Sequence, residues 1–409
     1  MVKRHLLTAL LALTMALSLF SPALAIQEDR RLLPAIRSGS GFPDTDGTVW
    51  AEAVTTVYET GLMDGWYQGD FRPHASMTNA QAVAVASRLH ARLTGDGYIS
   101  LIYDEAPWWA GYYRYFRRAM EGSGLDMPIY LREGVMARMA GDPCTREEFV
   151  RLTSYALELA DVTLPEINQV VLPDVLPGNY TETLEPCIYR FYNTGILTGS
   201  DRYGTFHGKQ AVIRGDAAMI LSRIVDPEKR VPLSLDTFDL CRDVLGVEPE
   251  TAALTAGETV ITMEQAAQTL GMALRQEGWE ALDGDIPRDD LTQGLNIAVE
   301  ELADDAAIGV LADREGVSWT AAELEAIYGP IPGDGCYGLT REGWLWAYSH
   351  SYLRQRLLER YAAQYGDDAE VYLEAALNEV RDEMTVTRSA ALEHLDLASI
   401  QQRLLKAFL

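Results

Sequence analysis

Apolar residues recur at helical spacing along most of the chain. Two of these stretches begin with Thr78-Asn79-Ala80-Gln81 and Thr145-Arg146-Glu147-Glu148. Both fit a capping box, in which the Thr hydroxyl and the Gln or Glu three residues later satisfy each other's backbone N–H groups. Further helices are predicted over residues 263–277, 291–314, 341–365 and 369–384, and an extended piece over residues 255–262. The predicted fold class is mainly α.

Similar segments recur at a regular interval within residues 42–230. Asn79, Arg146 and Arg214 take the second position of three helix starts, and they lie 67 and 68 residues apart. The first and third segments open on Phe42-Pro43-Asp44 and Leu172-Pro173-Asp174, and each later reaches a Gly-x-x-x-Gly turn. Units this short bury little by themselves, so three of them are expected to pack together.

The order of these elements resembles a triple S-layer homology (SLH) region. The first copy has Trp50-Ala51, Gly61-Leu62-Met63-Asp64-Gly65 and Phe71-Arg72-Pro73, and the third runs from Phe191 through Phe206 to Arg214. The resemblance implies repeats at 42–100, 101–165 (degenerate) and 166–230. It implies a pseudo-trimeric helical domain that binds secondary cell-wall polysaccharide in grooves between its prongs.

The resemblance also implies which residues contact the polysaccharide. A cation in the first turn of a helix opposes the helix dipole, and the family's arginine at the position of Arg146 and Arg214 contacts an acidic group of the ligand. Pairing with a neighbouring carboxylate is the alternative. Asn79 takes this position in the first copy, whose groove is expected to be weak. Trp50 and Trp109 match the family's tryptophan, for which packing is a commoner role than carrying a sugar.

Residues 231–409 are predicted to form a second helical domain. They loosely resemble the helical N-terminal domain of parvulin-type secreted foldases, through the extended piece and the turn Gly316-Val317-Ser318-Trp319-Thr320. No room remains for a catalytic isomerase domain, so the resemblance implies at most a binder of unfolded or extended peptides. Trp344, Tyr348 and Tyr352 form a stripe that is predicted to be core, and it is also the candidate peptide groove. His350 is interpreted as an ordinary helix residue.

The N-terminal sequence predicts where the protein is located, and the net charge limits its possible partners. Lys3 and Arg4, an apolar run and Ala23-Leu24-Ala25 predict a signal peptide over residues 1–25, followed by a linker over 26–41. The predicted location is the cell wall or surface of a bacterium, with no membrane span after cleavage. The formal net charge of -26 argues against nucleic acid as a partner.

No residue pattern predicts catalysis, a metal site or a cofactor. Asp44-Thr45-Asp46-Gly47 does not fit a calcium loop, and the four cysteines are too far apart for a zinc motif. Unpaired thiols are slightly favoured over two disulfides. The expected function is non-covalent, non-enzymatic wall anchoring. The open alternatives are a surface scaffold with degenerate, non-binding repeats and a wall-associated chaperone-like protein.

Overall fold

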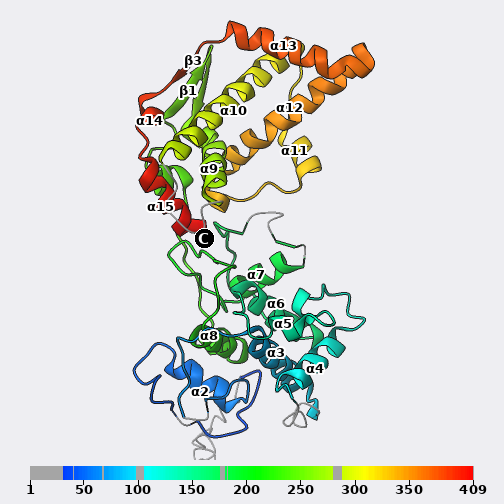
Figure 1. Cartoon of the computed structure of the whole chain (residues 1–409), viewed down its shortest axis with the longest axis vertical. Coiled ribbons are helices and arrows are strands. Elements are labelled where there is room, and N and C mark those ends of the chain that lie inside the picture. The colour runs from blue at the N-terminus through cyan, green and yellow to red at the C-terminus, as the bar shows by residue number, and fades with distance from the viewer. Residues whose placement is uncertain are drawn as a thin grey trace, which may run out of the picture.

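The structure is a computed structural model that describes residues 31–39, 41–66, 69–97, 106–175, 180–181, 183–279 and 288–408. The expected signal peptide lies outside these residues. The protein is mainly helical, as predicted, and three short strands are present in the described ranges. Figure 1 shows an elongated arrangement, with the N-terminal helices at one end and the C-terminal helices with the sheet at the other.

Within the described residues, the N-terminal unit contains seven α-helices. They are α2 (Ala51–Glu59), α3 (Asn79–Thr94), α4 (Ala110–Met120), α5 (Met136–Met139), α6 (Arg146–Leu159), α7 (Leu184–Asn193) and α8 (Arg214–Val225). The capping box at the start of α3 is complete. The one at α6 is half formed, because the Thr145 hydroxyl accepts the Glu148 N–H at 3.3 Å while the Glu148 carboxylate lies 3.5 Å from Arg151 instead. The competing cation explains this departure from the prediction.

A closed ring of backbone hydrogen bonds joins the segments that precede α3, α6 and α8. The N–H of Met77 donates to the carbonyl of Val212, that of Val212 to Cys144, and that of Cys144 to Met77, at 2.9, 2.9 and 2.8 Å. All three residues are buried. Each segment thus donates a hydrogen bond to one neighbour and accepts one from the other. These bonds fix the starts of the three helices around one centre.

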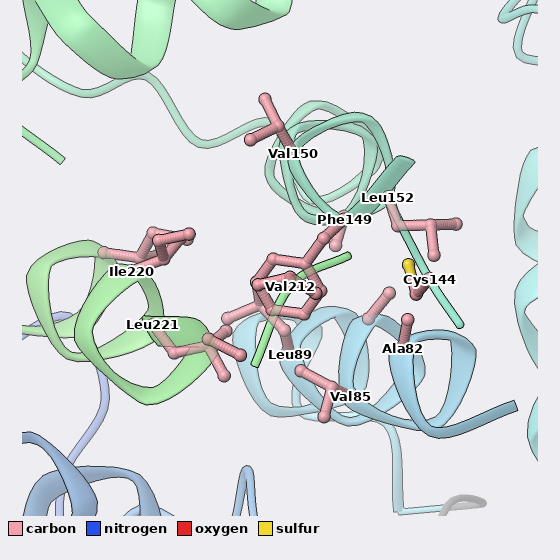
Figure 2. Close-up of a cluster of buried hydrophobic side chains, with 14 of the residues drawn as sticks. Ala82, Val85, Leu89, Cys144, Phe149, Val150, Leu152, Val212, Ile220 and Leu221 are labelled. Atoms are coloured by element: carbon pink, nitrogen blue, oxygen red, sulfur yellow. The ribbon is translucent and has the colours of Figure 1, made fainter. Parts of the chain in front are cut away.

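The main hydrophobic core of the N-terminal unit lies beside this ring. Figure 2 shows side chains from α3, α6 and α8 converging on it, with Phe149 and Val212 near the middle and Leu89 and Leu221 next to them. These four side chains are at most 3% exposed. Helices whose apolar stripes face inward in this way stabilise one another far more than their intrinsic propensities do.

Residues 31–37 of the expected linker pack against the N-terminal unit. Leu33 is buried in its core, the Leu32 N–H donates to the carbonyl of Val225, and the Ile36 N–H donates to that of Glu59. Leu235 still packs against the N-terminal core, and Phe238 is buried in the core of the C-terminal unit. The boundary between the units therefore lies between these residues, a few residues after the expected boundary at 230.

The C-terminal unit combines helices with a small antiparallel sheet. Its elements are η4 (Leu240–Leu245), β1 (Ala252–Ala256), β2 (Thr259–Thr262), α9 (Met263–Trp279), α10 (Arg288–Glu315), α11 (Ala321–Tyr328), α12 (Arg341–Tyr365), α13 (Ala369–Glu383), β3 (Val386–Arg388), α14 (Ala390–Glu393) and α15 (Leu397–Phe408). The four predicted helices are confirmed to within a few residues. The extended piece is a hairpin, and the strand order is β2-β1-β3. The sequence pattern did not predict β3, α11, α14 or α15.

The two units touch where the loop after Leu172 meets the loop before α12, and where the loop after α7 meets the segment between the two cores. The Tyr337 N–H donates to the carbonyl of Pro173 at 2.9 Å, and the Asp236 N–H donates to that of Arg202 at 3.0 Å. All four cysteines are buried and none is disulfide-bonded. Among the described residues, no helix has the length and apolar character that crossing a membrane requires.

The separate cores predict separable unfolding. Phe149→Ala should lower the unfolding free energy of the N-terminal unit by about 3–5 kcal/mol, because it empties a fully buried aromatic site. Leu377→Ala, in the core of α10, α12 and α13, should lower only that of the C-terminal unit. Scanning calorimetry of residues 26–409 measures both. If the two variants shift one common transition equally, the cores are not independent.

Candidate functional site

Each of the three helix starts meets a loop that belongs to another segment. The backbone N–H of Arg214 donates to the carbonyl of Ala75, that of Arg146 to Gln210, and that of Asn79 to Asp142. These distances are 2.8–3.0 Å. We refer to the three places as the Arg214, Arg146 and Asn79 junctions. The ring of hydrogen bonds therefore brings each predicted ligand-contacting residue against chain that is far away in sequence.

At the Arg214 junction, the guanidinium is held by main-chain oxygens. Its Nε donates to the Phe71 carbonyl and one terminal nitrogen to the Asp64 carbonyl, both at 2.8 Å. The guanidinium also lies 4.5 Å from the centre of the Phe71 ring. Arg214 is 6% exposed, and burial lowers the pKa of Arg214 to about 10, which leaves it charged at neutral pH. Neither expected role, ligand contact or a carboxylate partner, accounts for these two bonds; they tie α8 to the loop after α2.

Trp50 covers the next two residues of α8. Its Nε1 donates to the Asp216 carboxylate at 3.0 Å. Its ring lies so close to Gly215 that a Cβ added there would be 2.7 Å from it. The exposed His74 ring also meets Trp50 edge-on, with the ring centres 4.8 Å apart. The half-buried indole and the exposed imidazole thus form an aromatic surface beside a carboxylate, at the same junction as Arg214.

The Arg146 junction has a different chemistry. The Arg146 guanidinium lies 5.6 Å from the centre of the Phe206 ring, and no salt bridge to it is present among the described residues. Its Nε is buried without a hydrogen-bond partner. Arg146 is half-buried rather than buried, so part of its side chain is open to a group outside the protein, whereas two donors of Arg214 are bonded to main-chain carbonyls.

At the Arg146 junction, the buried acid Glu147 takes the position that Gly215 has at the Arg214 junction. Glu147, the residue after Arg146, is 7% exposed and its Oε1 lies 2.7 Å from the Lys209 ammonium. Its Oε2 is buried with no hydrogen-bond partner. A Cβ added at Gly208 would lie 2.7 Å from the hydroxyl of Tyr180 and 3.1 Å from Glu147 Oε2. An acid and a tyrosine thus fill the space at this junction.

The Asn79 junction carries no cation at the matching position. Asn79 is buried and its Nδ2 donates to the Met139 carbonyl at 3.0 Å. Trp109 is the N-cap residue of α4, as Trp50 is of α2. The aromatic partner of Trp109 is Tyr113 on its own helix, with ring centres 6.1 Å apart. The structure therefore places Trp50 against the two residues that follow Arg214, whereas the ring partner of Trp109 lies on its own helix.

Several residues of these junctions were missed in the sequence. The sequence pattern did not identify His74, Glu147, Lys209 or Asp216 as ligand candidates. The signal was present in the residue after the arginine, which is Gly215 in one copy and Glu147 in the other. A small residue leaves room for an aromatic cover, and a long acid does not.

The C-terminal stripe is mostly core, as predicted. Trp344 and Tyr352 are 6% and 4% exposed. Tyr348 is stacked on Tyr328, with ring centres 4.8 Å apart. This face of α12 is therefore covered by α9 and α11 rather than open to a peptide.

Comparison with known proteins identifies one family segment. The family model of the S-layer homology domain matches residues 41–83, which include Phe42, Trp50 and Asn79. This match supports an S-layer homology protein that is associated with the cell wall or cell surface and anchored there. No curated protein and no solved structure matches the chain.

Gly215→Ala tests the cover over α8. The added methyl has no space under Trp50, so the indole should move away from Asp216 and the unfolding free energy should fall by about 1–3 kcal/mol. Near-ultraviolet circular dichroism and urea unfolding report the two effects. Gly141→Ala is the matched control, because a Cβ there meets nothing within 4 Å. Equal effects in both variants would contradict the packing described.

Glu148 gives the Arg146 junction a pH dependence. Burial raises the pKa of Glu148, although Arg151 and Tyr130 oppose the shift. A carboxyl with a raised folded-state pKa destabilises the fold when ionised, so its penalty is present above that pKa and disappears as the pH falls through it. Glu148→Gln should therefore raise the urea midpoint at pH 8 more than at pH 4. An unchanged or larger gain at pH 4 would contradict this sign.

Proposed function

We propose that residues 42–230 form three SLH-type repeats that anchor the protein non-covalently to an anionic secondary cell-wall polysaccharide. The proposal includes export by the predicted signal peptide and a non-catalytic role. The observation that carries it is the ring formed by Met77, Cys144 and Val212, because three helix starts at near-equal sequence spacing meet there. The matched segment at residues 41–83 supplies the family context for the first of them.

The charge distribution supports this role for the N-terminal unit. Residues 26–230 contain 20 Lys and Arg against 27 Asp and Glu, a net charge of -7, whereas residues 231–409 contain 12 against 33, a net charge of -21. The acidity that would repel an anionic glycan is thus concentrated outside the proposed anchor. Because exposed charges are screened beyond about 8 Å at physiological salt, local cations decide the contact.

The junctions support unequal roles for the candidate residues. Arg146 is a half-buried cation beside the Phe206 ring, and Arg214 lies next to the aromatic pair of Trp50 and His74. We propose that Arg146 contacts an acidic group of the glycan, and that Trp50 and His74 carry a sugar ring. Asn79 and Trp109, which belong to the junction without a cation, contribute little.

A second candidate function concerns residues 231–409. We propose that this unit binds extended peptides, an idea favoured by the pocket that it carries away from the covered stripe of α12. A chain whose repeats no longer bind glycan would instead be a surface scaffold, and one that only captures peptides would be a wall-associated chaperone.

Sedimentation with purified cell walls tests the anchor. The mature chain, residues 26–409, should sediment with walls and remain soluble once the secondary polysaccharide has been stripped. Arg146→Gln should weaken binding by about tenfold to a hundredfold, the cost of losing one charged hydrogen bond. Trp50→Leu should also weaken it, and Asn79→Ala should not.

The stability of each variant separates binding from folding. Arg214→Ala removes a buried cation from two carbonyls and is expected to lower the unfolding free energy by about 1–3 kcal/mol, so its effect on binding is read only against its thermal midpoint. Binding that persists on stripped walls would overturn the polysaccharide as ligand. A band of cleared wall in a zymogram would overturn the non-catalytic role.

A further inference from the structure

A pocket of about 310 Å³ opens in the C-terminal unit between β2, α10 and α12. Its walls are about equally polar and apolar and include two indoles, and its volume is at the lower end of the range for ligand pockets. It takes up the face of α12 opposite the covered stripe. The side chains that shape it are Ile261, Val310, Trp319, Trp346, His350 and Leu353.

His350 presents a hydrogen-bond acceptor in this pocket. Its Nδ1 lies 3.0 Å from the Trp346 carbonyl, and a carbonyl oxygen only accepts, so Nδ1 carries the proton. Burial lowers the pKa of His350 to about 4, which keeps the ring neutral at physiological pH. The remaining nitrogen, Nε2, therefore has a lone pair and no proton. Among the described residues, no hydrogen bond to Nε2 is present.

The surroundings of His350 select a matching ligand group. The Trp346 ring lies 4.3 Å from the imidazole, and Trp319 adds a second indole to the lining. The two indoles favour a flat aromatic body, and Nε2 favours one that carries an O–H or N–H donor. Asp313 is exposed at the pocket, and the unit carries a net charge of -21. An acidic ligand is therefore disfavoured, and cationic flanks are favoured.

The strand beside the pocket indicates a polypeptide rather than a free small molecule. β2 is an outer strand of the sheet, and its Thr259 and Ile261 line the pocket. Val260, between them, is 55% exposed. An outer strand offers N–H and C=O groups along its free edge, which an extended peptide can pair with while its side chains alternate between the two faces.

We propose that the pocket receives a tyrosine or tryptophan side chain of an extended, basic peptide segment that pairs along β2. The side-chain O–H or N–H donates to His350 Nε2. This inference rests on the peptide-binding part of the proposed function, and it names the site and the ligand class of that part.

Titration calorimetry of the mature chain with matched peptides tests the pocket. The probes are a ten-residue lysine-flanked peptide with a central tyrosine, the same peptide with phenylalanine there, and the tyrosine peptide with glutamates in place of the lysines. Phenylalanine should weaken binding by about tenfold, because Nε2 then loses its donor. In His350→Phe the two lysine peptides should bind equally. Equal binding in the wild type, or preference for the glutamate peptide, would overturn the proposal.

A second variant blocks the pocket without disturbing its walls. Gly309 lines the pocket from α10, and a Cβ there meets nothing within 4 Å. Gly309→Leu should fill the space, abolish binding of the tyrosine peptide and keep the fold, since leucine also suits a helix better than glycine. Ser351→Ala, at an exposed position of α12 outside the pocket, should bind like the wild type.

The outcomes separate this inference from the broader proposals. If Gly309→Leu binds the peptide normally, or if N-acetyltyrosinamide binds as tightly as the peptide, the pocket is not a peptide site. If Gly309→Leu still delays the aggregation of an unfolded protein as the wild type does, the unit binds peptides at another place. That result would contradict the pocket as the peptide site. Wall sedimentation of the same variant reports on the anchor alone.

Discussion

Three backbone hydrogen bonds in the ring of Met77, Cys144 and Val212 determine most of the N-terminal architecture. Each of these buried N–H and C=O groups would cost free energy without a partner, and no segment can supply its own. The segments must therefore assemble together, although they are separated by more than sixty residues. Once assembled, they fix the N-termini of α3, α6 and α8, and with them the three junctions. The apolar core next to the ring adds the hydrophobic free energy that offsets the entropy of closing such long loops.

The same constraint explains why equivalent arginines acquire different environments. Both follow the ring by two residues, so both enter the neighbouring loop at the same point. At α8 that loop offers two free carbonyls, from Asp64 and Phe71, and the guanidinium satisfies them. At α6 the residue after the arginine is an acid, which engages Lys209, and the helix that packs on α6 is preceded by Thr183 instead of a tryptophan. The two junctions therefore differ in the residue after the arginine, glycine or glutamate, and in the residue before the covering helix, Trp50 at α2 and Thr183 at α7.

The sequence predicted the regular elements well and the junction chemistry poorly. Capping residues and apolar periodicity are local signals, and they located α12 at its observed bounds and α13 to within one residue. The pairing of β3 with β1 spans about 130 residues and leaves no local signal, so β3 was missed. For the same reason, the regular spacing of the helix starts identified Arg214 as a candidate residue. It could not predict the carbonyls to which Arg214 donates, which lie about 150 residues earlier. The prediction that the Trp344 stripe is core was confirmed, because a wide aromatic stripe on a long helix needs a partner surface.

The uneven charge of the two units has a consequence for orientation under the proposed anchoring. Attraction of a few local cations to an anionic polymer acts over about one Debye length, and so does repulsion of the acidic unit. In the elongated molecule of Figure 1 these opposing effects act at opposite ends. The near-balanced end can approach the polymer, whereas the end with a net charge of -21 is held away from it. The pocket beside His350 belongs to the repelled end, so the wall itself would keep that pocket facing solvent and the basic segments that the acidic surface attracts.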